Sequence, residues 1–169
     1  MILRKANTAD KDIIWDILQY AIALRKLDGS NQWQDGYPNQ ASIQQDLDNG
    51  YGYVMEDEEG IILLYAAIIF DKEPAYDDIE GQWLSHSDYM VLHRIAVSPL
   101  AKGRGIAMLL FQMVEDLCRE NNVYSIKVDT NFDNIPMLKI LERSGYQYCG
   151  EVFFRGSARK AFEKLLTAS

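Results

Sequence analysis

Cysteine and histidine are scarce in this sequence, with two residues of each among 169. Two cysteines, Cys118 and Cys149, cannot build a disulfide framework, and we expect both to be reduced thiols in or near the core. With only His86 and His93 in addition, the chain lacks zinc ligands at a usable spacing. The sequence therefore predicts neither a disulfide-stabilised scaffold nor a metal site.

Basic residues are also few. Lysine and arginine total 17 against 25 aspartates and glutamates, which gives a net charge of −8. Nucleic-acid binders obtain most of their affinity from cations placed on phosphates, so this balance argues against a nucleic-acid partner. It leaves room for a small anion held by a local basic loop, and an acidic surface mildly favours cationic partners such as amines.

Long hydrophobic runs are missing as well. The longest, "IILLYAAIIF" at residues 61–70, has ten residues, whereas a membrane-spanning helix needs about 20. We interpret this run as a strand buried on both faces. The start of the chain, "MILRKANTADKD", turns polar at once and shows no signal peptide. We therefore expect a cytoplasmic protein with no membrane partner.

The length of the chain and the absence of a linker predict one domain over residues 1–169, and hydrophobic periodicity predicts that it is α/β. An amphipathic helix is expected at 10–26 and a shorter one ending near residue 49. A hairpin follows, and later strands are expected at 89–97, 124–130 and 146–154, with helices after residues 105 and 134. Early hairpins and late β-α-β units imply a mixed sheet with helices on its faces. The acidic segment 71–88 is a long loop, and such loops are often functional.

Two glycines and two cations stand between a predicted strand and a predicted helix in "SPLAKGRGIAMLLF", residues 98–111. A turn through Gly103 and Gly105 into a helix presents free backbone N–H groups at the positive end of the helix dipole. Lys102 and Arg104 add positive charge at the same place. The pattern predicts an anion site, and glycines that merely cap the helix are the alternative. It matches neither the dinucleotide fingerprint nor the P-loop.

A longer stretch, "HRIAVSPLAKGRGIAMLLFQMVEDL", resembles the central motif of the GCN5-related N-acetyltransferase (GNAT) family. In that family, Q/R-x-x-G-x-G/A opens a helix that binds the pyrophosphate of acetyl-CoA. A second stretch, "NIPMLKILERSGY" at residues 134–146, is similar to the family pattern N-x-x-A-x-x-L-Y-E-x-x-G-F. Lys102 stands in place of the first Gln or Arg, and Leu141 in place of the Tyr.

The resemblance implies the GNAT fold, a central mixed sheet flanked by about four helices. It also bears on the tail of the chain. Local periodicity at residues 158–166 fits a helix, whereas the family fold ends in a strand inserted beside the fifth one. We predict a strand.

The implied activity is acetyl-CoA-dependent transfer of an acetyl group to a primary amine of a small molecule or peptide, by direct attack in a ternary complex and without a metal. Two alternatives are open: a CoA-binding regulatory module without turnover, which Leu141 favours, and a transferase for a longer acyl-CoA. A homodimer is compatible with the family. The residues expected to bind the coenzyme are Ile95, Ala96, Val97, Lys102, Gly103, Arg104, Gly105, Ile106, Ala107 and Asn134. Among these, the backbone of residues 95–97 is assigned the pantetheine contacts and oxyanion stabilisation.

Two residues are candidates for the base that deprotonates the amine. His93 suits proton transfer at neutral pH, and a hydrogen-bonded core histidine is the alternative interpretation. Asp129 aligns with a carboxylate base of some family members, and it could instead order the following loop. Because Leu141 replaces the usual acid, Tyr146 or water would take that role, or no acid is needed. Trp33, Tyr37 and Trp83 are candidates for the acceptor pocket, with loop anchoring as their alternative role.

Overall fold

The computed structural model describes residues 1–168 as a mixed α/β fold. Within these residues, eight strands are hydrogen-bonded in the order β1-β2-β3-β5-β6-β8-β7-β4, and four α-helices accompany them. The sheet is mixed because β5 and β6 are parallel, whereas β2 and β3, or β7 and β8, are antiparallel. The mixed sheet and the number of helices confirm the predicted fold class.

Contacts within the chain define two compact units. The first unit comprises residues 1–68 and 94–110, and the second comprises residues 69–93 and those from 111 onward. Strand β5 (Met90–Val97) and helix α3 (Ile106–Glu120) each contribute residues to both units. That the chain is a single domain stays a prediction. No helix of the described part of the chain is long and apolar enough to cross a membrane.

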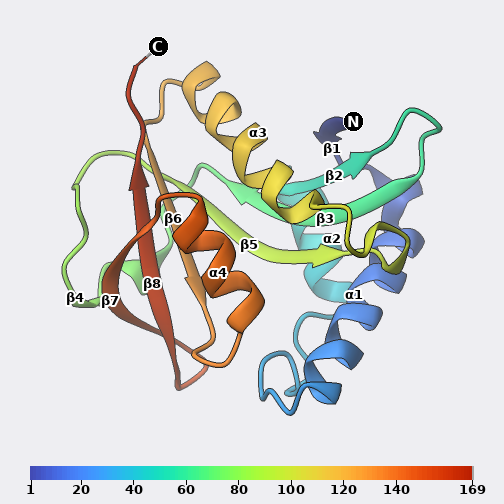
Figure 1. Ribbon diagram of the computed structural model, residues 1–169, viewed down its shortest axis with the longest axis horizontal. Coiled ribbons are helices and arrows are strands. Elements are labelled where there is room, and N and C mark those ends of the chain that lie inside the picture. Colours follow the sequence, from blue (N-terminus) through green and yellow to red (C-terminus); the bar gives the residue numbers. More distant parts are fainter. Residues whose placement is uncertain (169) are drawn as a thin grey trace. The chain divides into compact units, whose positions relative to one another are not determined.

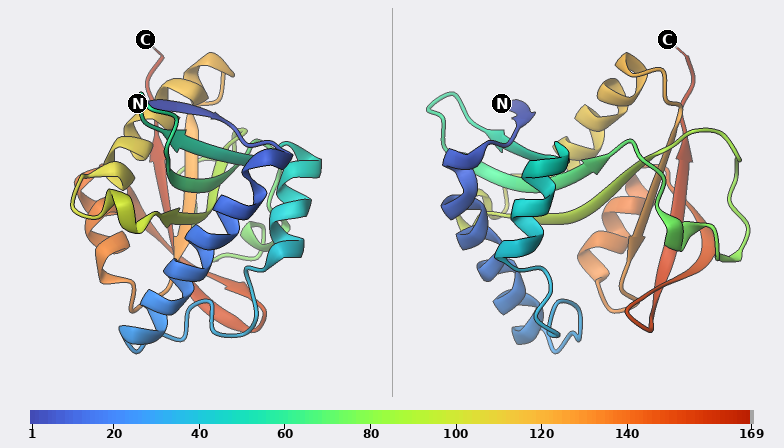
Figure 2. Two further views of the ribbon diagram at one scale, coloured as in Figure 1. Left: turned by 90° about the vertical axis from the view of Figure 1, so that its right-hand side faces the viewer. Right: turned by 180° about the vertical axis from the view of Figure 1, so that it is seen from behind.

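The first unit carries two helices on one side of its strands (Figure 2). Its elements are β1 (Ile2–Lys5), α1 (Lys11–Leu27), α2 (Gln40–Asn49), β2 (Gly52–Glu56) and β3 (Ile62–Ile69). Residues Ile14 and Leu18 of α1 and Ile43 of α2 pack with Val54 and Tyr65 in one hydrophobic cluster. The run at 61–70 forms β3, and all but the last of its strand residues are buried, as predicted.

The second unit is dominated by a long antiparallel hairpin (Figure 1). Its elements are β4 (Glu80–Gly81), the start of β5, β6 (Ser125–Thr130), α4 (Ile135–Arg143), β7 (Gln147–Phe154) and β8 (Ser157–Leu165). The loop between β3 and β5 contributes Tyr76 and Trp83 to a core cluster with Val91 and Val152. This long loop therefore contributes aromatic side chains to the core, although most of its residues are exposed.

The tail of the chain is a strand, β8, as predicted. Its buried positions alternate, and they include Arg159 and Glu163 as well as Ala161. Because two of the inward-facing residues are charged, the period-2 pattern is hidden from a hydrophobicity count. The apolar residues that remain happen to fall at helical spacing, which explains why the local pattern favoured a helix.

Close contact between two backbones fixes the far end of the 71–88 loop. Gly81 of β4 pairs with Gly150 of β7. A Cβ at Gly81 would lie 2.1 Å from the carbonyl oxygen of Cys149, and a Cβ at Gly150 would lie 2.2 Å from that of Glu80. Both glycines also have positive φ, +141° and +139°. Only glycine fits at either position.

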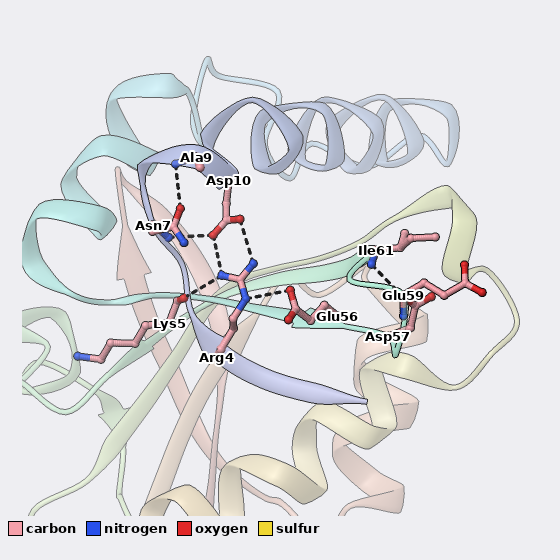
Figure 3. A network of polar contacts seen from close by, with 9 residues as sticks. All are labelled: Arg4, Lys5, Asn7, Ala9, Asp10, Glu56, Asp57, Glu59 and Ile61. Atoms are coloured by element: carbon pink, nitrogen blue, oxygen red, sulfur yellow. Dashed lines mark hydrogen bonds and ion pairs between the residues drawn. The ribbon is translucent and has the colours of Figure 1, made fainter.

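A charged network holds the start of the chain in the first unit (Figure 3). The guanidinium of Arg4 donates two hydrogen bonds to Asp10, of 2.8 and 3.0 Å, and its Nε donates to Glu56 at 2.9 Å. Asp10 also accepts from the backbone N–H of Asn7 at 2.9 Å and completes a capping box. The hydrogen bond from Arg4 holds the pKa of Asp10 below its usual value, although burial opposes this.

This network should make the free energy of unfolding depend on pH in the acidic range. A carboxyl whose pKa is lowered in the folded state stabilises the fold above its unfolded pKa of about 4, and this contribution is lost as the pH falls through the folded pKa. We expect Asp10→Asn to lower the free energy of unfolding at pH 7 by about 1–2 kcal/mol. The difference from the wild type should shrink near pH 3 in urea titrations.

Asp16→Asn serves as the control. It removes one negative charge from an exposed position of α1 and leaves the Arg4–Asp10–Glu56 network intact. A difference between wild type and Asp10→Asn that stays constant from pH 7 to about pH 3 would contradict the role of the Asp10 carboxylate.

Candidate active site

The predicted anion site is formed by the loop that joins β5 to α3, in the first unit. A short 3₁₀ turn, η3 (Pro99–Ala101), follows β5, and α3 begins at Ile106. Between them, Gly103 and Gly105 have φ values of +76° and +68°. Residues with a Cβ reach this left-handed region only at a cost. The glycines are therefore required by the backbone path.

The surroundings of this loop suit an anion. No atom lies within 4 Å of a Cβ placed at Gly103 or Gly105, so the backbone is open to a ligand. The N–H groups of the first turn of a helix have no acceptor within the helix, and α3 has 15 residues. Lys102 and Arg104 are exposed beside the glycines. Ile106 is buried, so only its backbone, and not its side chain, can contact a bound anion.

The other predicted coenzyme residues fall in two places. Ile95, Ala96 and Val97 end β5 and belong to the first unit together with the glycine loop. Ala96 packs in the hydrophobic cluster of that unit. Asn134 belongs to the second unit, where its side-chain oxygen accepts a hydrogen bond from the N–H of Met137 at 3.4 Å and caps α4.

The two candidate bases are neighbours in the second unit. His93 Nδ1 lies 3.6 Å from Asp129 Oδ1, and His93 Nε2 lies 3.4 Å from Glu73 Oε2. The side chain of His93 is 14% exposed, that of Asp129 is 10% exposed and that of Glu73 is 23% exposed. His93 Nε2 is buried without a hydrogen-bond partner among the described residues. The imidazole thus stands between two carboxylates, and its buried Nε2 makes no hydrogen bond to the described residues.

Tyr76 fixes the position of Asp129. Its hydroxyl donates a hydrogen bond of 2.6 Å to Asp129 Oδ1. Burial, reinforced by the Asp129 charge, raises the pKa of Tyr76 well above its usual value, so the phenol keeps its proton and acts as the donor. The rings of Tyr76 and Phe154 contact the imidazole of His93, with centroid distances of 6.1 and 5.6 Å.

Sequence reasoning missed Glu73 and Tyr76 as residues of this cluster. Both come from the acidic segment 71–88, which the sequence marked as a long and potentially functional loop without singling out these side chains. The acidic character of the loop marked it as a candidate functional segment. Nothing local in the sequence indicates which of its acidic residues contacts His93.

The three predicted acceptor residues are divided between the two units. Trp83, in the second unit, is buried, and its indole Nε1 donates a hydrogen bond of 2.8 Å to the carbonyl of Tyr76. This contact anchors the loop. Trp33 and Tyr37 are half-buried in the first unit. Their role in acceptor binding stays a prediction.

Tyr37 belongs to a second charged cluster that the sequence did not indicate. Its hydroxyl accepts a hydrogen bond of 2.5 Å from Arg94. Arg94 also donates to both carboxylate oxygens of Asp46, at 2.9 and 2.5 Å, and the hydroxyl of Tyr65 donates to the same carboxylate. Arg94 has a φ of +53°, unusual for a residue with a side chain. The cluster holds the 28–40 loop on β5.

Leu141 and Tyr146 bear on the open question of the acid. Leu141 is fully buried in α4. Tyr146 is buried too, and its hydroxyl has no hydrogen-bond partner within residues 1–168. Burial raises the pKa of Tyr146 well above its usual value, so its hydroxyl stays protonated. It keeps a proton that it could donate.

Comparison with known proteins agrees with the motifs and the fold. The model of the acetyltransferase (GNAT) family matches residues 18–146. A GNAT-family acetyltransferase from Streptococcus agalactiae is 37% identical, covers 98% of this chain and 95% of its own, and superposes with a TM-score of 0.88. The N-acetyltransferase YesJ of Bacillus subtilis is 27% identical over 83% of this chain and 76% of its own length.

A more distant fold neighbour was solved with the coenzyme. The Salmonella typhimurium protein yncA, in a structure with its cofactor acetyl-CoA, is 16% identical, with a TM-score of 0.68 over 99% of this chain and 94% of its own. GNAT proteins of this fold therefore bind acetyl-CoA, and the enzymes of the family acetylate amines. On the family match and the close structural relative together, this chain belongs to the GNAT family of N-acetyltransferases.

Proposed function

We propose that this enzyme uses acetyl-CoA to acetylate a primary amine of a small molecule or peptide, by direct attack in a ternary complex. The observation that carries the proposal is the glycine loop at residues 102–107, which opens the first turn of α3 to an anion between two cations. Acetyl-CoA is the donor that this loop would suit, because its diphosphate is a compact dianion.

The donor is held by main-chain groups of the first unit. The N–H groups of the first turn of α3, which Gly103 and Gly105 leave open, bind the diphosphate, and the side chains of Lys102 and Arg104 add electrostatic attraction. The backbone of residues 95–97 lines the pantetheine arm. When bound, acetyl-CoA supplies the acetyl group as a thioester. The residues present fit this coenzyme, since nothing occupies the space above either glycine.

The acceptor is deprotonated by His93. An alkyl ammonium has a pKa near 10 and cannot attack until it loses a proton. The free Nε2 of His93 accepts a proton from the amine. The Asp129 carboxylate, 3.6 Å from Nδ1, attracts the imidazole proton to that nitrogen and so leaves Nε2 to act as the base, while Tyr76 holds Asp129 in place. The new C–N bond forms as the C–S bond breaks, and the sulfur leaves as a thiolate, which takes up the second proton that the nitrogen releases.

Acetyl-CoA binding tests the donor half of the proposal. Acetyl-CoA should raise the melting temperature through linkage, whereas free acetate should not. Gly105→Ala places a methyl group where the diphosphate meets the backbone and should weaken acetyl-CoA binding by about 10- to 100-fold, as expected for a lost charged hydrogen bond. The measurement is the shift in melting temperature against acetyl-CoA concentration.

Gly60→Ala is the matched control. Gly60 has a φ of +78° and, like Gly105, no atom within 4 Å of its Cβ position. Both variants carry the same backbone strain, but only Gly105→Ala should lose the response to acetyl-CoA. An equal response in the two variants would contradict the assigned site, and absence of thiol release over a panel of amines would contradict the transfer reaction.

A further inference from the structure

Glu73 has no part in the reaction described above, yet it faces the nitrogen that carries it out. We propose that Glu73 binds the ammonium group of the acceptor together with His93, and that this enzyme prefers alkyl amines without a carboxylate on the adjacent carbon. This inference rests on the proposed function, since it names the acceptor class of the same site.

The Glu73 carboxylate is held in one orientation. Its Oε1 accepts a hydrogen bond of 3.2 Å from the N–H of Ala75, which caps the 3₁₀ turn η2 (Pro74–Tyr76). Its own backbone N–H donates to the hydroxyl of Tyr89 at 3.0 Å. Both contacts lie within the second unit and direct Oε2 toward His93. The acid is pre-positioned before any ligand arrives.

The pairing of a carboxylate oxygen with an unpartnered imidazole nitrogen suits a donor with several N–H groups. Oε2 and Nε2 are 3.4 Å apart, and Nε2 has no hydrogen-bond partner within the described residues. A single nitrogen can lie about 2.8–3.0 Å from both atoms at this separation. An ammonium carries three donors. It can therefore bond to the carboxylate and the imidazole at once, which places its proton beside the base.

The charge around His93 determines the class of amine. Glu73 and Asp129 approach the two nitrogens of the same imidazole, so the site presents two carboxylates to the acceptor. A like charge brought next to such groups costs several kcal/mol. An α-amino acid carries its own carboxylate one carbon away from the amine, and it is therefore disfavoured. A simple alkyl amine carries only the positive charge of its ammonium group, which the two carboxylates attract.

Steady-state kinetics with Glu73→Gln test the binding role. The carboxamide oxygen still accepts from Ala75, so the cap is kept, and only the charge is removed. We expect KM for 2-phenylethylamine to rise by about 10- to 100-fold, the effect of losing a charged hydrogen bond, with kcat and acetyl-CoA affinity changed by less than about threefold. Asp78→Asn, which removes a charge from an exposed position of the same loop, should leave KM unchanged.

Paired acceptors test the substrate class. 2-Phenylethylamine and phenylalanine, or tryptamine and tryptophan, differ only by the α-carboxylate. Wild-type kcat/KM should favour the amine of each pair by about 100-fold or more. Equal values within the pairs, or an unchanged KM in Glu73→Gln while thiol is released normally, would overturn the inference and leave the proposed function intact.

A binding measurement separates the inference from the proposed function. The chain has two histidines, so ¹⁵N imidazole spectra are simple, and His93→Gln assigns them. 2-Phenylethylamine should shift the His93 Nε2 signal in the wild type and not in Glu73→Gln. No shift with any amine overturns the inference. A shift without thiol release supports the inference and overturns the proposed transfer reaction.

Discussion

Replacing Glu163 by alanine should lower the free energy of unfolding by about 3–5 kcal/mol, the cost of breaking a buried charged pair by removing one partner. Glu163 is fully buried in β8. Its Oε1 accepts from the hydroxyls of Ser85 and Ser125 at 2.6 and 2.7 Å, and its Oε2 accepts from the N–H of Leu84 at 2.6 Å. Three donors would lose their acceptor.

A buried cation depends on the same carboxylate. Lys127 is directly opposite Glu163 in the β6–β8 register and is also buried. Its Nζ lies 4.4 Å from the ring centroid of Trp83 and 4.0 Å from that of Tyr89. Burial lowers the pKa of Lys127, and the charge of Glu163 opposes this shift. Without Glu163, the ammonium would keep its aromatic contacts and lose its counter-charge.

Urea unfolding measures this effect, with Glu120→Ala as a control at an exposed position of α3. The control should change the free energy of unfolding by less than about 0.5 kcal/mol. A loss below about 1 kcal/mol in Glu163→Ala would show that the Lys127 and Glu163 charges are not coupled as described.

Replacing His93 by glutamine should lower kcat/KM by about 10²- to 10⁴-fold, the usual contribution of a general base. Glutamine keeps a polar group beside Asp129 but cannot take up a proton at neutral pH. The effect should fall mainly on kcat, because this variant retains Glu73, the residue we propose to bind the ammonium. Thiol release with saturating acetyl-CoA is the measurement, and an unchanged melting temperature would show that the fold is intact.

His86→Gln is the matched control for this variant. His86 is the other histidine of the chain and is exposed in the 71–88 loop. Its replacement should leave kcat/KM within about twofold of the wild type. A decrease of less than tenfold in His93→Gln would exclude His93 as the base and would support its alternative interpretation as a core histidine.

Local sequence patterns predicted those elements whose conformation is determined by neighbouring residues in the chain. Helix α2 ends at Asn49 and is capped by Gly50, which has a φ of +70°, where the sequence placed a helix end. The glycine loop before α3 was predicted for the same reason, since its conformation depends on the residues within it. Strand β8 needed the family resemblance, because burial of Arg159 and Glu163 conceals its alternation.

The contacts of the candidate site could not be predicted in this way. His93 and Asp129 were identified separately, but Glu73 meets His93 from a loop 20 residues earlier in the chain. The pairing of Arg94 with Asp46 joins residues 48 positions apart. Such contacts follow from strand order and loop packing, and no spacing in a single sequence encodes them.

The glycine pair at positions 81 and 150 limits which changes the 71–88 loop of this enzyme can accept. The loop that carries Glu73 and Tyr76 is held at Gly81 by pairing with Gly150. The two backbones are so close there that neither residue can carry a Cβ. Mutagenesis aimed at new substrates can vary the exposed residues 77 and 78 freely. A side chain at either glycine would clash with the opposite backbone, separate β4 from β7, and displace the loop that carries Glu73.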